Sequence, residues 1–385
     1  MQKILSLVSC LSLAATLLNS CQSQKMENKS CFLLVGTYTV KNNSDGIYVY
    51  DFNEDSGTLK LISQTDKVEN PSYLAFSKNY EYLYAVNENL DDSTPGRVSA
   101  FHFNQQEGEL RFLNTVPSNG SAPCFITVDT SGKNVLEANY NGGNFSVFKT
   151  DSDGKLLPAV QIIAQTGKSV NKYRQTQPHV HSTFLSPDEK YVFVCDLGND
   201  TLYQYPFDAK NAEPLDVSGA KKYKVPDGYG PRHIAFSPDK KNLYLLNELE
   251  GKLMAFKMQN DSLQYLQTIA STEVPDTALH DKSSAAIRMA TNGKFLYTSN
   301  RGNANDIAIF AVNSDGTLKE VGRQPTDEIP RDFNIDPSGK FLLVASKTRN
   351  NIKVYAINQQ SGALTYTGHS VELPAPVAIL FAPKK

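Results

Sequence analysis

The sequence predicts an all-β fold, a seven-bladed β-propeller with four antiparallel strands in each blade. The composition favours strands, because Tyr and Phe number 19 each and β-branched residues are frequent. A unit of four expected strands recurs along the chain at about 50 residues, the size of a propeller blade. The two ends of the chain together supply one further unit, so we expect both termini to close the last blade.

Six full copies of the unit begin with the same pair of strands. A proline or small residue opens a short apolar strand, a polar turn follows, and a second apolar strand ends in a polar pair. The copies begin at Pro71, Pro123, His181, Pro231, Ser284 and Pro330. A third strand, a turn and a weaker fourth strand complete each copy. The Ser-Pro-Asp and Asp-Pro-Ser-Gly turns favour hairpins and weigh against a β-solenoid, the alternative for a repeat of this size.

The seventh unit is divided between the ends of the chain. Residues 374–383 match only the first strand of the repeat, whereas residues 30–39, 46–52 and 59–65 match the second, third and fourth strands. An open ring would leave two unpaired sheet edges. We therefore expect residues near 376–381 to pair with residues near 31–36.

The N-terminal segment is typical of an exported bacterial lipoprotein. A basic start precedes an apolar run of 15 residues, Ile4–Leu18, which is too short for a stable membrane span. The run ends in Leu-Asn-Ser-Cys, which resembles a lipobox whose cysteine, Cys21, carries the lipid. A plain secretory signal with an incidental cysteine is the alternative. The predicted segments are a signal peptide (1–20), a lipid-anchored tether (21–30) and one propeller domain (31–385), which faces the periplasm or the cell surface.

Charge and motif content exclude several classes of protein. The formal net charge of −2 argues against nucleic-acid binding. Cys31, Cys124 and Cys195 lie inside or beside apolar runs, so we expect buried free thiols. No Cys/His pair has zinc-like spacing, and no Gly-x-Ser-x-Gly elbow indicates a serine hydrolase. We expect a monomer without cofactor or metal that acts on a small molecule and meets the membrane only through its lipid.

One mouth of the channel is predicted to hold the functional site. The first strand of a blade lines the channel and the second returns antiparallel, so the start of the first and the end of the second meet at one mouth. Counting from the hairpin turns places Arg232 opposite Asn247 and His181 opposite Asp196. The polar residues expected there are Asn87, Glu88, Asn139, Tyr140, His179, His181, Asp196, Arg232, His233, Asn247, Glu248, Arg301, Arg331 and Lys347.

Six short motifs around this mouth resemble one protein family. They are Gln177–Ser182, Gly230–Phe236, Leu246–Leu249, Ala286–Arg288, Ser299–Gly302 and Pro330–Phe333. They are similar, in the same order, to motifs of the seven-bladed lactonases, which include bacterial 6-phosphogluconolactonases and fungal carboxymuconate lactonizing enzymes. The resemblance extends from about Phe32 to Pro383. One departure is Ala345-Ser346-Lys347, where members often have Ala-Asn-Gln, and it makes this part of the mouth more basic.

The resemblance implies a core set of four residues, His181, Arg232, Glu248 and Arg301. Lactone hydrolysis needs an activated water, a stabilised oxyanion and a proton for the leaving alkoxide. We assign His181 and Glu248 to the acid/base work and the two arginines to anion binding. Further substrate contacts are expected from His179, Asn87, Glu88, Asp196, Asn247 and Arg331. The ligand is then a lactone or an anionic sugar.

Structural roles are the alternative for each core residue. His181 could cap a strand end, Arg232 and Glu248 could form an ion pair between blade edges, and Arg301 could bind connecting carbonyls. A calcium site built from Glu88, Asn87, Asn139 and Asp196 is a less favoured alternative, because these residues lie in different blades. At the level of function, a non-catalytic propeller that binds a sugar or a protein, and a lactone cycloisomerase, remain open beside the hydrolase.

Overall fold

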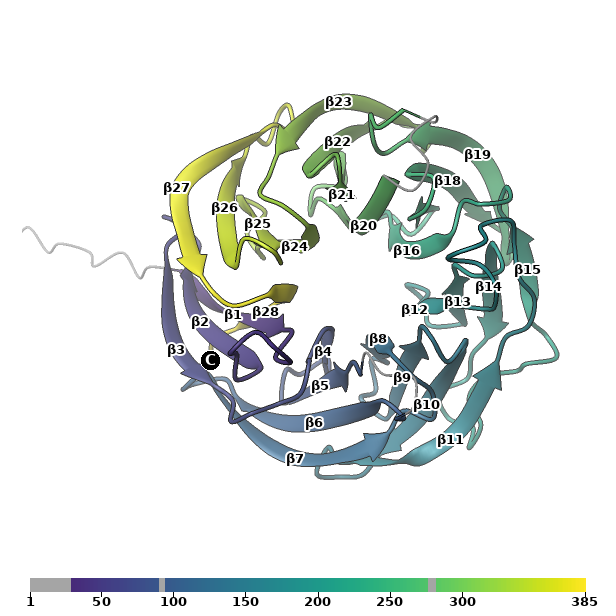
Figure 1. Ribbon diagram of the computed structural model, residues 1–385, viewed down its shortest axis with the longest axis horizontal. Helices are drawn as coiled ribbons and strands as arrows, with labels where there is room; N and C mark the ends of the chain where they lie inside the picture. Colours follow the sequence, from purple (N-terminus) through teal and green to yellow (C-terminus); the bar gives the residue numbers. More distant parts are fainter. Residues whose placement is uncertain (1–28, 90–93, 276–281) are drawn as a thin grey trace, which may run out of the picture.

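The computed structural model describes residues 29–89, 94–275 and 282–385. The strands of these ranges form seven sheets of four antiparallel strands, arranged in a ring (Figure 1). In the part of the chain that the structure describes, no helix is long and apolar enough to cross a membrane. The predicted seven-bladed propeller is confirmed, whereas the predicted signal peptide and the lipidation site Cys21 lie outside the described residues.

Blade 1 is the blade that both ends of the chain build. Its order is β28 (Pro376–Pro383), β1 (Ser30–Thr37), β2 (Ile47–Asn53) and β3 (Leu59–Gln64). Strand β28 pairs with β1 from Cys31 opposite Pro383 to Gly36 opposite Ala378, as predicted. In Figure 1 the last strand lies beside the first, so the C-terminal segment closes the ring.

The other six blades follow the chain in order. Blade 2 has β4 (Leu74–Phe76), β5 (Tyr82–Asn87), β6 (Arg97–Asn104) and β7 (Glu109–Pro117). Blade 3 has β8 (Pro123–Val128), β9 (Asn134–Asn139), β10 (Asn144–Thr150) and β11 (Leu156–Ala164). Blade 4 has β12 (Val180–Leu185), β13 (Tyr191–Asp196), β14 (Thr201–Pro206) and β15 (Lys221–Lys224).

Blade 5 has β16 (Pro231–Phe236), β17 (Asn242–Asn247), β18 (Lys252–Gln259) and β19 (Ser262–Ala270). Blade 6 has β20 (Lys282–Met289), β21 (Phe295–Gly302), β22 (Asp306–Val312) and β23 (Leu318–Pro325). Blade 7 has β24 (Pro330–Ile335), β25 (Phe341–Ser346), β26 (Asn351–Ile357) and β27 (Leu364–Glu372). The innermost strand of every blade is therefore the one that begins at a copy of the repeat, or β28 in blade 1.

Apolar side chains pack between neighbouring blades and form the core of the ring. A separate cluster of buried residues lies between each pair of adjacent blades. Between blades 7 and 1, for example, the Phe52 ring meets Phe341 and Phe381 edge-on at centroid distances of 5.8 and 5.6 Å. Cys31, Cys124 and Cys195 are buried free thiols within these clusters, as expected.

Buried tyrosines join several blades to the next blade along the chain. Each lies on a second strand and donates its hydroxyl to the carbonyl of a turn glycine in the neighbouring blade. The pairs are Tyr84 with Gly154 (3.0 Å), Tyr244 with Gly316 (3.1 Å) and Tyr297 with Gly362 (2.9 Å). Because a buried hydroxyl needs a partner, these bonds favour one relative position of the blades.

The first strands of several blades carry an extra residue close to the mouth where the site was predicted. Cys124, His181, Arg232 and Arg331 each lie at a break in register between the first and second strands, between residues that pair with consecutive partners. Such a bulge leaves the extra residue out of the cross-strand pairing and changes the direction of its side chain. Blades 3, 4, 5 and 7 therefore each supply one bulged residue at the same level of the ring.

Two predicted cross-strand pairs are wrong by one residue, Arg232 with Asn247 and His181 with Asp196. Pro231 and Val180 take the positions opposite Asn247 and Asp196. Counting from the turn gives the right register along most of each hairpin, and the bulge then shifts it by one. The bulge affects the site directly, because a bulged side chain can turn toward the channel.

Candidate active site

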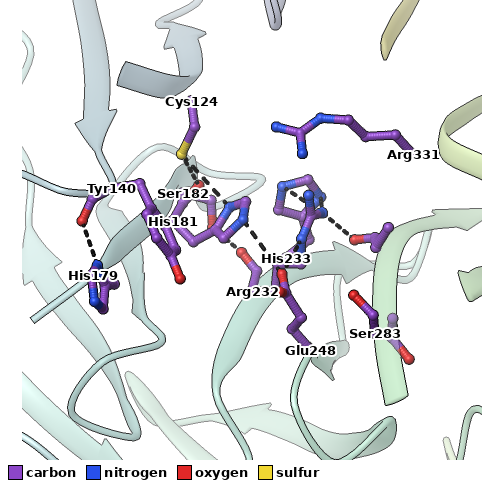
Figure 2. A network of polar contacts seen from close by, with 12 residues as sticks. Cys124, Tyr140, His179, His181, Ser182, Arg232, His233, Glu248, Ser283 and Arg331 are labelled. Atoms are coloured by element: carbon purple, nitrogen blue, oxygen red, sulfur yellow. Dashed lines mark hydrogen bonds and ion pairs between the residues drawn. The ribbon is translucent and has the colours of Figure 1, made fainter. Parts of the chain in front are cut away.

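Two sets of residues surround the predicted mouth. One set consists of the bulged residues of the first strands. The other set lies one residue beyond a buried polar residue near the end of the second strand in six of the seven blades, and its members are Tyr38, Glu88, Tyr140, Glu248, Arg301 and Lys347. Both sets come from the same end of their hairpins, so repetition of the blade brings them to one mouth. Figure 2 shows the four bulged residues together with Tyr140 and Glu248 of the second set.

Glu248 lies at the centre of the first cluster. Its side chain is 4% exposed, and its Oε2 accepts a hydrogen bond from Arg232 Nε at 2.9 Å. Arg301 NH2 lies 3.2 Å from the same oxygen, and His181 Nε2 lies 3.7 Å from it. Arg174 NH2 binds the other oxygen, Oε1, at 2.7 Å. The structure thus brings together the four residues predicted as the core set, and it adds a third arginine.

Electrostatics keep this carboxylate ionised and the neighbouring imidazole neutral. Burial opposes the charge of Glu248, but Arg301, Arg174 and Arg232 outweigh burial and hold the pKa of the carboxyl well below its usual range. Burial, followed by the positive charge of Arg232, lowers the pKa of His181 well below 6.5. The imidazole is therefore unprotonated at neutral pH and able to accept a proton.

Arg174 was missing from the predicted site. It lies in the segment 165–179, which connects blade 3 to blade 4, and its NH2 also donates to the Tyr140 hydroxyl at 2.8 Å. Its guanidinium stands over the Tyr140 ring at 5.9 Å. The His179 ring stacks on the same tyrosine with centroids 4.4 Å apart. The pattern of strand ends predicts no site residue in this segment, although any link from a fourth strand to the next first strand lies at this mouth.

A second carboxylate, Glu88, lies at the same mouth. Tyr38 donates its hydroxyl to Glu88 Oε2 at 2.8 Å, and Arg331 NH2 lies 3.5 Å from the same oxygen. The Arg331 guanidinium and the Lys347 ammonium both lie over the Tyr38 ring, 5.3 and 4.8 Å from its centroid. In Figure 2, Arg331 lies above His233, and its guanidinium points toward Cys124 and His181. Tyr38 was not among the residues predicted at this mouth, although it follows a second strand just as Glu88 and Glu248 do.

Aromatic residues close the bottom of the mouth. His233 is buried and meets the rings of His181, Tyr73, Phe125 and Phe184 edge-on at 5.3 to 5.9 Å. Burial and the charge of Arg232 lower the pKa of His233 well below 6.5, so this ring packs as a neutral group.

A cavity of about 390 Å³ lies on the far side of these aromatic rings. It is lined mainly by apolar residues of the first strands and by the ion pair of Arg288 with Asp332, whose atoms lie 2.9 Å apart. The rings of Tyr73 and Phe184 thus border both His233 and this cavity.

Three predicted substrate contacts instead hold the backbone. Asn87 bonds Ser99 at 2.6 Å and a backbone carbonyl at 2.8 Å, and Asn247 donates to a backbone carbonyl of its hairpin at 3.1 Å. Asp196 accepts three backbone N–H groups at 2.8 to 3.3 Å, and burial raises its pKa to about 6. We leave these three residues out of the proposed binding set.

Some contacts expected from purely structural roles are also present. Arg232 and Glu248 do form an ion pair, and Arg301 donates to the carbonyls of Ser283 and Ser284 at 3.3 and 3.5 Å. Arg232 NH1 also donates to the carbonyl of Ala285. These bonds hold the guanidinium groups in place, which a preorganised anion site requires. Among the described residues, no group of three or more His, Cys, Asp or Glu side chains could hold a metal ion.

Comparison with known proteins adds family information to this geometry. A family model described as lactonase, 7-bladed beta-propeller, matches residues 32–381. The 6-phosphogluconolactonase of Formosa agariphila is 37% identical over 335 residues, which cover 86% of this chain and 94% of that protein. The 6-phosphogluconolactonase of Bacillus subtilis is 35% identical over 349 residues, covering 90% and 97%.

A solved structure gives the same result. The periplasmic gluconolactonase of Pseudomonas aeruginosa superimposes with a TM-score of 0.86 at 34% identity, and the match covers 92% of this chain and 100% of that one. The resemblance carried by the six sequence motifs is confirmed. The chain belongs to the seven-bladed β-propeller lactonase family.

Proposed function

We propose that this chain hydrolyses a sugar lactone in the pocket formed by His181, Arg232, Glu248 and Arg301. The observation that carries the proposal is a neutral imidazole 3.7 Å from a buried carboxylate that three guanidinium groups surround. Ester hydrolysis needs a base and fixed positive charge at one place, and this arrangement supplies both. The relatives named 6-phosphogluconolactonase and gluconolactonase support an aldonolactone, with or without a phosphate, as the substrate.

His181 is the proposed general base. Its neutral ring takes a proton from water as the water oxygen attacks the lactone carbonyl, and the carbonyl oxygen becomes an oxyanion. Arg232 and Arg301 supply N–H donors and positive charge for that oxyanion. When the ring C–O bond breaks, the imidazolium returns the proton to the leaving alkoxide, and the product is a hydroxy acid.

Glu248 is proposed to work as a fixed negative charge. A carboxylate whose pKa is held far below its usual range is a weak base, so we assign Glu248 the role of a fixed charge rather than that of a proton acceptor. Because its Oε2 lies 3.7 Å from His181 Nε2, the carboxylate stabilises the imidazolium that forms during the reaction. It also fixes the directions of the arginines.

A panel of lactones tests the proposal. Gluconolactone, its 6-phosphate and an unsubstituted δ-lactone are incubated with residues 31–385, and ring opening is followed by acid release with the spontaneous rate subtracted. We expect turnover of at least one aldonolactone. A chain that turns over none of them and still binds an anionic sugar contradicts hydrolysis and favours a binding module.

Export and lipid anchoring belong to the same proposal. The apolar run that ends at Cys21 supports a lipoprotein signal, and one relative of similar structure is named as periplasmic. We expect Cys21→Ser to move the protein from the membrane fraction to the soluble fraction of cell extracts. Retention of the Ser variant on membranes would show that the anchor lies elsewhere. Closure of the ring by both termini supports a monomer.

A further inference from the structure

One ring nitrogen of His181, Nδ1, faces a buried thiol that the proposed hydrolysis does not use. Cys124 Sγ lies 3.8 Å from His181 Nδ1 and 3.4 Å from the carbonyl oxygen of the same histidine. Both residues are the bulged positions of neighbouring first strands, β8 and β12, and each is 5% exposed. The two bulges therefore bring the thiol against the imidazole, as Figure 2 shows.

The thiol has a single hydrogen, and the place of that hydrogen decides the direction of the contact with the imidazole. The carbonyl oxygen of His181 is nearer to the sulfur than the carbonyl oxygen of Val180, which lies at 3.9 Å. When the S–H group donates to the His181 carbonyl, the sulfur can act toward the ring only as an acceptor. The ring nitrogen in contact with it must then carry a hydrogen. This geometry favours the tautomer of neutral His181 that is protonated on Nδ1.

The other ring nitrogen, Nε2, lies on the side of Glu248. Its distance of 3.7 Å to Oε2 is too long for a hydrogen bond, and among the described residues Nε2 has no hydrogen-bond partner. The charge of the carboxylate nevertheless attracts a proton to Nε2. Without a partner for a hydrogen on Nδ1, the imidazole would favour the tautomer that is protonated on Nε2, which cannot accept a proton at this position.

An uncharged partner suits a base that has to stay neutral. Burial, followed by the negative charge of Glu88, raises the pKa of Cys124 well above 9.0, so the thiol keeps its hydrogen at neutral pH. A carboxylate or a thiolate beside Nδ1 would favour the imidazolium and raise the pKa of His181. The thiol accepts the hydrogen bond from Nδ1 without adding a negative charge, and Nε2 remains able to take up a proton from water.

We propose that Cys124 is a positioning residue for the general base: its thiol keeps the hydrogen of neutral His181 on Nδ1, so that the lone pair of Nε2 is directed toward Glu248 and the substrate. The catalytic part of this inference rests on the proposed lactone hydrolysis. As the water oxygen attacks the lactone carbonyl, the water proton moves to Nε2 while the hydrogen on Nδ1 stays directed at the sulfur. Return of the proton from Nε2 to the leaving alkoxide restores the same tautomer for the next turnover.

Cys124→Ala and Cys124→Ser test the positioning role, with Cys31→Ala as the matched control. Cys31 is also a buried thiol, 2% exposed, but it lies opposite Phe52 at the far end of its hairpin. In Cys124→Ala we expect kcat to fall about 2- to 10-fold with KM nearly unchanged, the range for loss of one ordinary hydrogen bond. Cys124→Ser should keep most of kcat, because a hydroxyl both donates and accepts. Cys31→Ala should lose a similar amount of thermal stability to Cys124→Ala and keep its kcat.

Nitrogen-15 NMR of protein labelled in its histidines reads the tautomer without any need for catalysis. The His181 signals are identified by their loss in His181→Gln. At neutral pH, the wild-type protein, Cys124→Ser and Cys31→Ala should carry the hydrogen on Nδ1, and in Cys124→Ala it should shift toward Nε2. A hydrogen on Nε2 in the wild-type protein, or an unchanged tautomer in Cys124→Ala, would overturn the inference. If no lactone is hydrolysed, the proposed function fails, and the NMR comparison still decides whether the thiol sets the tautomer.

Discussion

Glu248→Gln is the change that should disturb the pocket most while keeping its shape. The side chain is 4% exposed and has three guanidinium groups at 2.7, 2.9 and 3.2 Å. Glutamine keeps the volume but removes the charge that compensates these groups. Breaking a buried ion pair costs about 3–5 kcal/mol, and a domain has about 5–15 kcal/mol of stability, so we expect a folded but clearly weakened protein. Loss of the charge beside His181 should also lower turnover about 10²–10³-fold, as for other preorganised charges.

The assay pairs turnover with chemical unfolding and uses Glu328→Gln as the control. Glu328 lies in the link between blades 6 and 7 and is 51% exposed, with Arg349 at 3.3 Å. A surface pair of this kind contributes about 0–1 kcal/mol, so the control should keep both stability and turnover. Arg174→Gln added to Glu248→Gln should recover part of the lost stability, because one uncompensated charge is removed. Wild-type turnover in Glu248→Gln, or a stability equal to that of the control, would refute the reasoning.

Two further predictions follow from the same structure. Because the pKa of His181 lies well below 6.5, kcat/KM should stay level as the pH falls through 6.5 and drop only at lower pH, where the base becomes protonated. Arg232→Gln removes a charge that lowers this pKa, so the acid limb of the profile should move to higher pH, and an unmoved limb would contradict the assignment of the base. Deletion of residues 376–385 removes β28 and its buried apolar side chains at about 1.5–3 kcal/mol for each large one. That protein should be insoluble or unfolded by circular dichroism, whereas deletion of residues 384–385 alone should leave the melting temperature nearly unchanged.

Much of the fold could be predicted from the sequence, because each blade repeats the same pattern of apolar strands and polar turns. The turns, the apolar alternation and the divided last unit all indicate four-stranded blades in a closed ring. The cross-strand pairs that were predicted wrongly lie at single-residue bulges. A bulge adds one residue to a strand without any clear mark in composition, so the partners assigned to Arg232 and His181 were wrong by one position.

The candidate site was predictable where it depended on the ends of the hairpins. Glu248, Arg301 and Arg331 were expected at one mouth and do lie there. Asn87 and Asn247 share the same level but turn toward the backbone, because a polar side chain at a strand end can serve either use. The contact of Arg174 with Glu248 joins residues 74 positions apart through a segment without strand pattern, and nothing in the repeat predicts it.

The position of the site in the repeat explains how residues at the mouth can change while the strands of the blades keep their pairing. The buried asparagine or aspartate at the end of a second strand holds the hairpin end, as Asn87, Asp196 and Asn247 show. The bulged residue of the first strand and the residue just after the second strand are not needed to hold the end of the hairpin. Blades 3, 5 and 7 therefore each offer two side chains to the mouth, one from the bulge and one from the residue after the second strand. A substitution at either position, for example at Lys347, changes the charge of the site and leaves the pairing of the blade's strands intact, so substrate choice can change independently of the fold.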